Sequence, residues 1–304
     1  PPREVLEALS KVEWAGYGPP EGLPELREAL AQLFEVEPSE VAVTAGGRHG
    51  VAALMWAFRR RRIITVKPYY PGYLEIASAF DIPLQFVETG EGWMPSFAER
   101  AVYVVNYPNN PTGVVLSRGK VRELVDAAEF VISDEVYRDI AFEGLISPIE
   151  LTSDAALVYS FSKVLSVPGF RLGAVVGPRD VVRSVIKFTR ATLNSAPTPL
   201  QKAVAPVVPQ IPKLAERLSE VYRLRAAVAA EVLRYPFARP GGAFYVFPRV
   251  PCDGVSFMRR ALARGISVLP GESFGAPGHV RIALVRPEGE LRAALEELSA
   301  IDCG

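Results

Sequence analysis

The chain has 304 residues and a mass of 33.1 kDa, which is long enough for a large hydrophobic core and for two lobes. Its 34 basic and 34 acidic residues balance, which argues against nucleic acid or an anionic membrane as a general partner, because both attract a basic surface. Cys252 and Cys303 are too few for a disulfide framework and lack the spacing of a metal site, so they fit a reducing cytoplasm.

Residues 1–14, PPREVLEALSKVEW, predict a charged amphipathic helix rather than a signal peptide. No apolar stretch approaches the length of a membrane span. The two histidines, His49 and His279, offer few candidates for a histidine metal site or for a Ser-His-Asp triad. We therefore expect no metal.

Short apolar runs rich in β-branched residues follow, and they alternate with amphipathic helical patterns. Because these runs are continuously hydrophobic rather than alternating, they predict strands buried on both faces, as in a mostly parallel sheet covered by helices. This pattern is typical of an α/β fold. The strands are expected at 41–45, 63–66, 84–88, 102–106, 130–133, 156–161 and 172–177, and helices at 27–34, 51–58 and 120–128.

The pattern changes after about residue 205. A long helical stretch at 213–235 leads into shorter strand-like and helical segments, which indicates a smaller α+β lobe. We expect a large domain at 20–205 and a small domain at 206–304. Residues 1–19 are expected to join the small domain.

The loops after the strands carry the candidate functional residues, because ligands of parallel sheets bind beyond the carboxyl ends of the strands. TAGGRHG, residues 44–50, places Gly46 and Gly47 before a helix, where backbone N–H groups can approach an anion. The same glycines also fit an ordinary tight connection. No G-x-G-x-x-G or G-K-[ST] motif follows a strand, so a dinucleotide or Walker-type site is disfavoured.

Two further loops contain aromatic and amide residues. KPYYPGY, residues 67–73, can wall a flat ring or can pack in the core. YPNNPTG, residues 107–113, can present the Asn110 amide to a cleft, or can form an ordinary turn.

An acidic residue and a lysine follow the next two strands. Asp134 needs a partner if it is buried, and a protonated ring nitrogen would serve, although Asp134 also fits a helix N-cap. Tyr137, three residues after Asp134, is expected near the same side as Asp134 if the segment turns. Lys163 is one of seven lysines and lies between serines, where burial and nearby positive charge would favour the neutral amine that a Schiff base requires. Ser160 and Arg171 can converge on a phosphate.

Taken in order, these motifs resemble the fold-type I, pyridoxal-phosphate (PLP)-dependent aminotransferases of class I/II, and the resemblance extends over nearly the whole chain. It implies a three-layer α/β/α large domain with a mostly parallel sheet, plus a smaller α+β domain. It also implies a ping-pong transfer of an amino group from an L-amino acid to a 2-oxo acid. The motifs are YGPPEGLPELREAL, TAGGRHG, NYPNNPTG, SDEVY, SFSKVLSVPGFRLG and HVRIAL.

The resemblance also implies roles for the residues that face the cofactor. Lys163 would form the internal aldimine and move the proton at the substrate Cα. Asp134 would keep the pyridine nitrogen protonated, and Tyr70 would stack on the ring. Asn110 and Tyr137 would hydrogen-bond the phenolic oxygen. The phosphate would be held by Gly46, Gly47, Arg48, Ser160 and Arg171.

Two implied roles concern the substrate and a second subunit. Arg281, together with Asn110, would bind the substrate α-carboxylate. Tyr17 would reach the phosphate of a partner subunit, which implies a homodimer with shared sites. The cytoplasmic location is expected from the two cysteines.

Substrate and reaction type stay open at this stage. Arg190 is a candidate for binding a second carboxylate, or is a solvated arginine at a helix end. SVPGFRLG is also similar to the histidinol-phosphate aminotransferases and the threonine-phosphate decarboxylases. A decarboxylase or a C–S lyase on the same fold would share all of these residues. A ligand-sensing regulator is disfavoured because such proteins usually carry a basic helix-turn-helix domain in front, whereas the net charge of this chain is zero.

Overall fold

The computed structural model of the protein describes residues 1–12 and 16–303. Its main element is a seven-stranded sheet with the order β1-β7-β6-β5-β4-β2-β3. The pairs β2–β3, β2–β4, β4–β5 and β5–β6 are parallel, whereas β7 runs antiparallel to β1 and to β6. The strands are β1 (Val41–Thr44), β2 (Ile63–Val66), β3 (Leu84–Val87), β4 (Val102–Asn106), β5 (Phe130–Asp134), β6 (Ala155–Ser160) and β7 (Gly173–Val176).

Helices cover both faces of this sheet, and alternate strand residues face opposite layers. Val104 and Val158 belong to a core with α3, α4 and α7, whereas Val105 packs with α5 on the other face. The predicted α/β fold is therefore confirmed, and the predicted strands agree with the structure to within one residue at each end. The helices of the two layers are α2 (Pro24–Phe34), α3 (Gly47–Ala57), α4 (Gly72–Ala79), α5 (Arg118–Ala127), α6 (Phe161–Val164), α7 (Arg179–Thr192) and α8 (Thr198–Val204).

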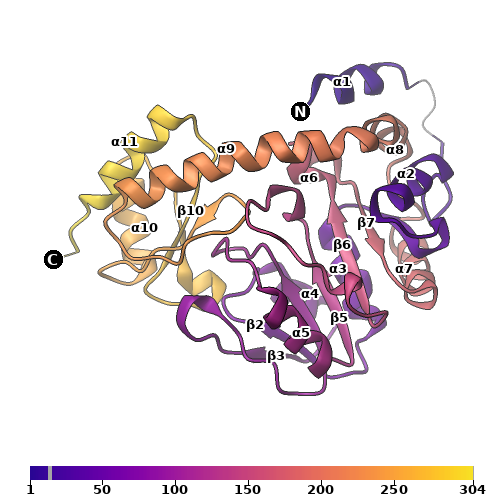
Figure 1. Cartoon of the computed structure of the whole chain (residues 1–304), viewed down its shortest axis with the longest axis horizontal. Coiled ribbons are helices and arrows are strands. Elements are labelled where there is room, and N and C mark those ends of the chain that lie inside the picture. Colours follow the sequence, from indigo (N-terminus) through magenta and orange to yellow (C-terminus); the bar gives the residue numbers. More distant parts are fainter. Residues whose placement is uncertain (13–15, 304) are drawn as a thin grey trace.

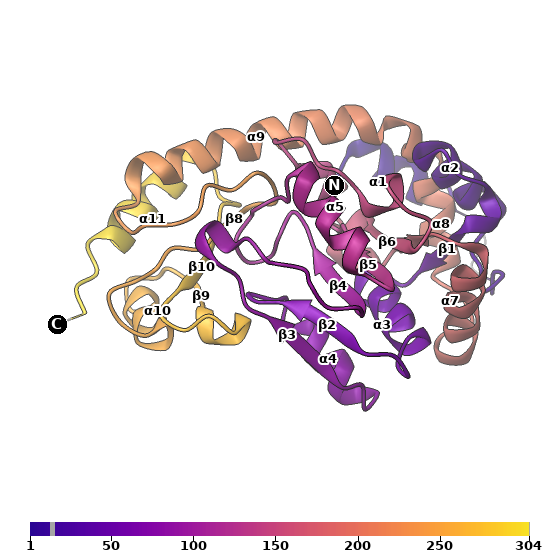
Figure 2. The same ribbon diagram turned by 60° about the horizontal axis from the view of Figure 1, so that its bottom comes forward.

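A second, three-stranded sheet lies beyond the carboxyl ends of the large one, with the order β8-β10-β9 (Figures 1 and 2). Helices α10 and α11 and the end of α9 pack on it and form a separate hydrophobic core. The elements are α9 (Ile211–Val232), β8 (Tyr245–Val246), α10 (Gly254–Leu262), β9 (Leu269–Pro270), β10 (Val280–Ala283) and α11 (Glu288–Ser299).

Helix α9 runs along the top of the molecule in Figure 1, from the small lobe to α8, and contributes to both cores. Ile211, its first residue, packs with Val207 and Val208 against the large sheet. Ala226 and Ala229, near its end, pack in the core of the small sheet. Within the described residues, no helix is long and apolar enough to cross a membrane.

The N-terminal helix α1 (Arg3–Ser10) packs on α8, and Val5 lies in a core of the large sheet. The sequence predicted a helix over 1–14 and placed residues 1–19 with the small lobe. Residues 13–15 lie outside the described part of the chain.

The prediction of two reduced cysteines was wrong, because Cys252 and Cys303 form a disulfide across a sequence separation of 51 residues. The physical reason is the path of the C-terminal segment, which turns back toward the start of α10. Arg260 donates to the carbonyl oxygens of Asp302 and Cys303, at 2.9 and 3.1 Å. Sequence spacing does not report this path, because it depends on tertiary contacts.

Candidate active site

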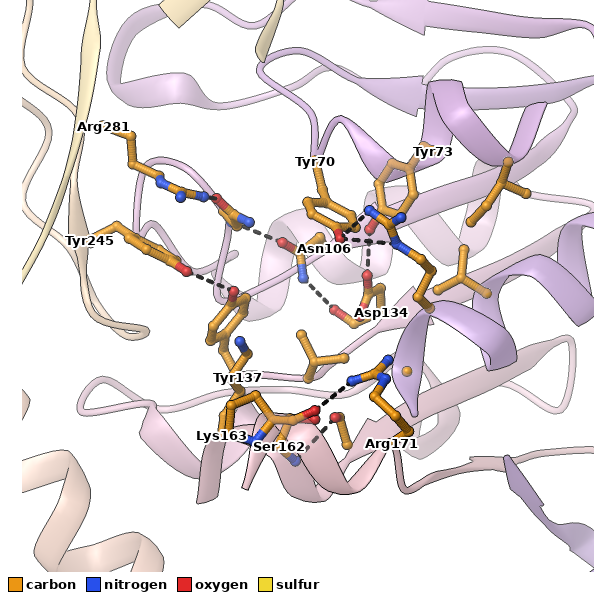
Figure 3. A pocket seen from close by; sticks show the side chains of 18 residues that line it. Tyr70, Tyr73, Asn106, Asp134, Tyr137, Ser162, Lys163, Arg171, Tyr245 and Arg281 are labelled. Atoms are coloured by element: carbon orange, nitrogen blue, oxygen red, sulfur yellow. Dashed lines mark hydrogen bonds between the residues drawn. The ribbon is translucent and has the colours of Figure 1, made fainter. Parts of the chain in front are cut away.

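A cavity of about 280 Å³ lies at the carboxyl ends of β4, β5 and β6, between the two sheets (Figure 3). Loops after the central strands form most of it, and the first turn of α3 closes one end. Tyr245 and Arg281 come from the small sheet and line the opposite side. The cavity therefore lies where the two lobes meet.

Lys163 lies in the short helix α6, directly after β6, and its side chain is half-buried. Its Nζ atom is 5.6 Å from the centroid of the Tyr137 ring and 5.7 Å from that of Phe244. Burial, followed by the positive charges of Arg281 and Arg171, lowers the pKa of Lys163, and Asp134 opposes this shift. A lowered pKa increases the fraction of neutral amine, which is the nucleophilic form.

Asp134 ends β5 and is buried, with one carboxylate oxygen bonded and the other free. The Tyr73 hydroxyl donates to its Oδ2 at 2.7 Å, whereas its buried Oδ1 has no hydrogen-bond partner. Burial raises the pKa of Asp134 from 3.8 to about 6, although the hydrogen bond from Tyr73 and the nearby Val136 backbone N–H counteract the shift. An unpartnered buried acceptor is costly, so Oδ1 fits a ligand that carries a proton donor.

The glycine turn and Arg171 form one end of the cavity. Gly46 has a φ of 83°, and a Cβ atom there would lie 2.7 Å from Arg171 Nη2. Gly47 begins α3, so backbone N–H groups of the first helical turn are free of intrahelical partners. Ser160 lines the same end and accepts a hydrogen bond from the Ser162 backbone. These donors suit an anion such as a phosphate.

Tyr70, labelled in the upper part of Figure 3, and Arg48 form one wall of the cavity. Arg48 Nη2 donates to the Tyr70 hydroxyl at 2.8 Å, and Arg48 Nη1 forms a 2.8 Å ion pair with Glu75. The Tyr70 ring meets the Tyr73 ring edge-to-face, with centroids 5.6 Å apart. This wall can hold one face of a planar ring.

Asn110 and Arg281 meet across the two lobes. Arg281 Nη1 donates to Asn110 Oδ1 at 2.7 Å, while the buried Arg281 Nε has no partner. Asn106 supports this arrangement, because its Oδ1 accepts from the Asn110 backbone at 2.8 Å and its Nδ2 donates to the Asp134 carbonyl at 2.7 Å. A free guanidinium donor in a cavity suits a carboxylate.

The structure brings most of the predicted site residues together around this cavity. Tyr17 and Arg190 do not line it: Tyr17 is 83% exposed, and Arg190 is exposed in the last turn of α7. Gly46 packs directly beside Arg171. The predicted residues that line the cavity are Gly47, Arg48, Tyr70, Asn110, Asp134, Tyr137, Ser160, Lys163, Arg171 and Arg281.

Four polar residues that line the cavity were not singled out from the sequence: Tyr73, Asn106, Ser162 and Tyr245. Tyr73, Asn106 and Ser162 lie inside motifs that were recognised, within four residues of a chosen residue. Tyr245 lies in GGAFYVFPRV, which the sequence assigned only to the smaller α+β lobe. A tyrosine in the middle of an apolar strand was the available signal, because a buried hydroxyl needs a hydrogen-bond partner.

The pattern of the family described as aminotransferase class I and II matches residues 2–298. The chain belongs to the class I and II aminotransferases. An aspartate aminotransferase of Thermococcus kodakarensis is 36% identical over 307 residues, with 97% of this chain and 84% of the relative covered. An aspartate/prephenate aminotransferase of Thermus thermophilus is 32% identical over 337 residues, with 99% and 87% covered.

Solved structures agree with the family. A mutant of the Thermus thermophilus aspartate aminotransferase superposes with a TM-score of 0.92 at 31% identity, covering 98% of this chain and 92% of that chain. The aminotransferase therefore has the fold-type I architecture that the motifs predicted, and it is a transaminase.

Proposed function

We propose that this aminotransferase uses PLP and transfers an amino group from an acidic L-amino acid, with aspartate as the donor, to a 2-oxo acid by a ping-pong mechanism. The observation that supports this most strongly is the free Oδ1 of buried Asp134, in the same cavity as a lysine with a lowered pKa. Aspartate is proposed because relatives from Thermococcus kodakarensis and Thermus thermophilus carry that donor in their names.

The residues around the cavity fit PLP. Asp134 Oδ1 would accept from the ring nitrogen, Tyr70 would cover one face of the ring, and Tyr137 and Asn110 would donate to the phenolic oxygen. Lys163 Nζ would attach the cofactor covalently. Bound PLP supplies an electron sink for charge that develops at the substrate Cα. The phosphate would be held by the backbone at Gly46, Gly47 and Arg48, and by the side chains of Ser160 and Arg171.

Lys163 would move a proton at the substrate Cα. Its Nζ must be neutral to accept this proton, and the nearby guanidinium groups of Arg281 and Arg171 favour the neutral amine. Tyr73 would assist through Asp134, because its hydrogen bond favours the ionised form of Asp134.

Arg281 and Asn110 would bind the α-carboxylate, using the free Arg281 Nε. A second carboxylate needs a further cation. Lys163 and Arg171 already have roles in the described cavity, and the remaining cation, Arg48 at its rim, is paired with Glu75, so a second carboxylate would compete with Glu75 for Arg48. Arg190 is exposed in α7 and does not line the cavity, so we do not assign it to the substrate.

We further propose a homodimer and a cytoplasmic location. Exposed Tyr17 would reach the phosphate end of the partner's cavity, where its hydroxyl would add a donor. The disulfide is unusual for a reducing compartment, so quantitative thiol alkylation in freshly lysed cells tests the location.

The deciding experiment is an absorbance spectrum of the PLP-loaded enzyme during addition of single L-amino acids. Aspartate should abolish the cofactor band without an oxo acid present, and a 2-oxo acid should restore it. Release of carbon dioxide, sulfide or ammonia instead would assign a decarboxylase or a C–S lyase.

Lys163→Ala should lose the covalent label that borohydride fixes between the protein and PLP. Labelling that persisted in this variant would contradict the role of Lys163.

A further inference from the structure

Tyr245 connects the two halves of the cavity through two different parts of its side chain. It lies in β8 of the small sheet, and its hydroxyl oxygen is 3.0 Å from that of Tyr137 in the large lobe. Its ring packs under the Arg281 guanidinium, with Arg281 Cζ 4.3 Å from the ring centroid. Figure 3 shows Tyr245 and Arg281 entering from the same side, with Tyr137 opposite the Tyr245 hydroxyl.

We propose that Tyr245 is a positioning residue with two separable actions: its hydroxyl orients the proton of Tyr137, and its ring holds Arg281 for the substrate carboxylate. The inference rests on the proposed function, since it refines how Tyr137 and Arg281 act there. Tyr245 itself need not touch the reacting atoms.

The hydroxyl action follows from the capacity of two phenols. Each hydroxyl has one proton, so in a Tyr–Tyr pair one donates and the other accepts. Arg281 lies directly over the Tyr245 ring, and a neighbouring cation makes a phenol the better donor. With Tyr245 as donor, the Tyr137 proton is free to point into the cavity, where the phenolic oxygen of PLP would accept it.

The ring action follows from how Arg281 is held. Its guanidinium lies between the rings of Tyr245 and Phe274, at 4.3 and 5.0 Å from their centroids. Stacking on two aromatic faces restricts the rotation of the guanidinium plane. With Nη1 fixed on Asn110, this arrangement fixes the orientation of the buried, unpartnered Nε.

Two substitutions separate the actions. Tyr245→Phe keeps the ring and removes the hydroxyl, so KM for aspartate should stay within about twofold while kcat falls about three- to tenfold. The pH midpoint of the cofactor's absorbance change should rise by about 0.5 to 1 unit, because a weaker hydrogen bond to the phenolic oxygen favours its protonated form. Tyr245→Leu removes both parts, and KM should rise about tenfold as well.

A double-mutant cycle with Tyr137→Phe tests whether the hydroxyl acts through Tyr137. In the Tyr137→Phe background, Tyr245→Phe should have no further effect on kcat or on the pH midpoint. Tyr235→Phe is the matched control, because it removes a small-lobe hydroxyl that bonds only the carbonyls of Leu298 and Ile301 among the described residues. It should leave the midpoint and KM unchanged.

The outcomes separate this inference from the proposed function. If the wild-type protein does not bind PLP or respond to aspartate, the proposed function fails. If the wild-type protein responds and Tyr245→Phe changes neither kcat nor the midpoint, or acts equally without the Tyr137 hydroxyl, the hydroxyl action is wrong. Equal KM in the Phe and Leu variants would overturn the ring action. If Tyr245→Leu does not fold, Tyr245→Met gives the same comparison, and the affinity of the apoprotein for PLP checks that both variants keep the cofactor site.

Discussion

Asp134 is a buried carboxylate whose charge is poorly compensated until a ligand supplies a proton donor. Its folded-state pKa of about 6 lies above the ordinary 3.8, so the folded apoprotein disfavours the charged form. The contribution of protonated Asp134 to the free energy of unfolding is fully present below about pH 4, and it is lost as the pH rises through about 6. Above that pH the charge costs about 3 kcal/mol of folding stability.

Asp134→Asn should therefore stabilise the apoprotein while it weakens PLP binding. At neutral pH the free energy of unfolding should rise by up to about 3 kcal/mol, and its fall between about pH 4 and 6 should become shallower. Denaturant unfolding of the apoprotein at several pH values measures this, and PLP titration measures the affinity. An apoprotein that is less stable than the wild type at neutral pH would contradict this account of Asp134.

Tyr73→Phe removes the hydrogen bond that favours the ionised form of Asp134. The pKa of Asp134 should rise further, so Asp134 becomes protonated at a higher pH. As the pH is lowered, PLP affinity should therefore begin to fall at a higher pH than in the wild type. Titrating PLP into the apoprotein from about pH 5 to about pH 8 locates this fall. Tyr103→Phe is the control, since Tyr103 is buried and donates to the Glu99 carbonyl away from the cavity. If both variants give the wild-type profile, Tyr73 does not influence Asp134.

At the scale of elements, the register of the parallel strands aligns the polar residues that end them. Asn106 of β4 pairs with Asp134 of β5, so both side chains reach the cavity at the same level. The sequence predicted these strands well because burial on both faces requires uninterrupted apolar runs. It also predicted which strand ends line the cavity, because their polar residues interrupt those runs.

Contacts between distant elements were not predictable in this way. The partnership of Tyr73 with Asp134 depends on how α4 crosses the sheet, and that of Tyr245 with Tyr137 depends on how the lobes dock. The pairing of Cys252 and Cys303 depends on the return of the C-terminal segment. Spacing along the chain encodes none of these distances.

The turn between β1 and α3 gives a prediction at this scale. Gly46→Ala places a methyl group 2.7 Å from Arg171 Nη2 and forces alanine into a φ of 83°. The backbone strain alone costs about 1 to 2 kcal/mol, and Arg171 must move away from the phosphate end. PLP affinity should fall about tenfold or more. Gly144→Ala is the matched control, because nothing lies within 4 Å of its added methyl group.

Calorimetric titration of both apoproteins with PLP makes the comparison. Unchanged affinity in Gly46→Ala would mean that this turn does not form the phosphate site.

At the scale of the whole molecule, the disulfide ties the C-terminal segment to the start of α10. Closing a loop across 51 residues removes unfolded-state entropy worth roughly 4 kcal/mol. Cys303→Ser should lower the free energy of unfolding by up to about that amount. Urea unfolding with and without reductant tests this, since reductant should bring the wild type to the variant's midpoint. A wild type that is indifferent to reductant would show that the bond contributes nothing.

The expected boundary between domains at residues 205 and 206 remains a proposal, and core membership favours a division within α9. Val207, Val208 and Ile211 pack with the large sheet, whereas Ala226 and Ala229 pack with the small one. The exposed middle of the helix, including Leu224, separates the two groups.

A single uninterrupted helix of 22 residues thus belongs to two hydrophobic cores. If either core melts, half of α9 loses its packing, and an isolated half-helix of that length is only marginally stable in water. Melting should then spread along α9 to the other core, so that calorimetry of the apoprotein gives one cooperative transition rather than two. Two resolved transitions would contradict this coupling. Heat damage would accordingly leave few half-folded molecules with one lobe intact, since the lobes would survive or fail together.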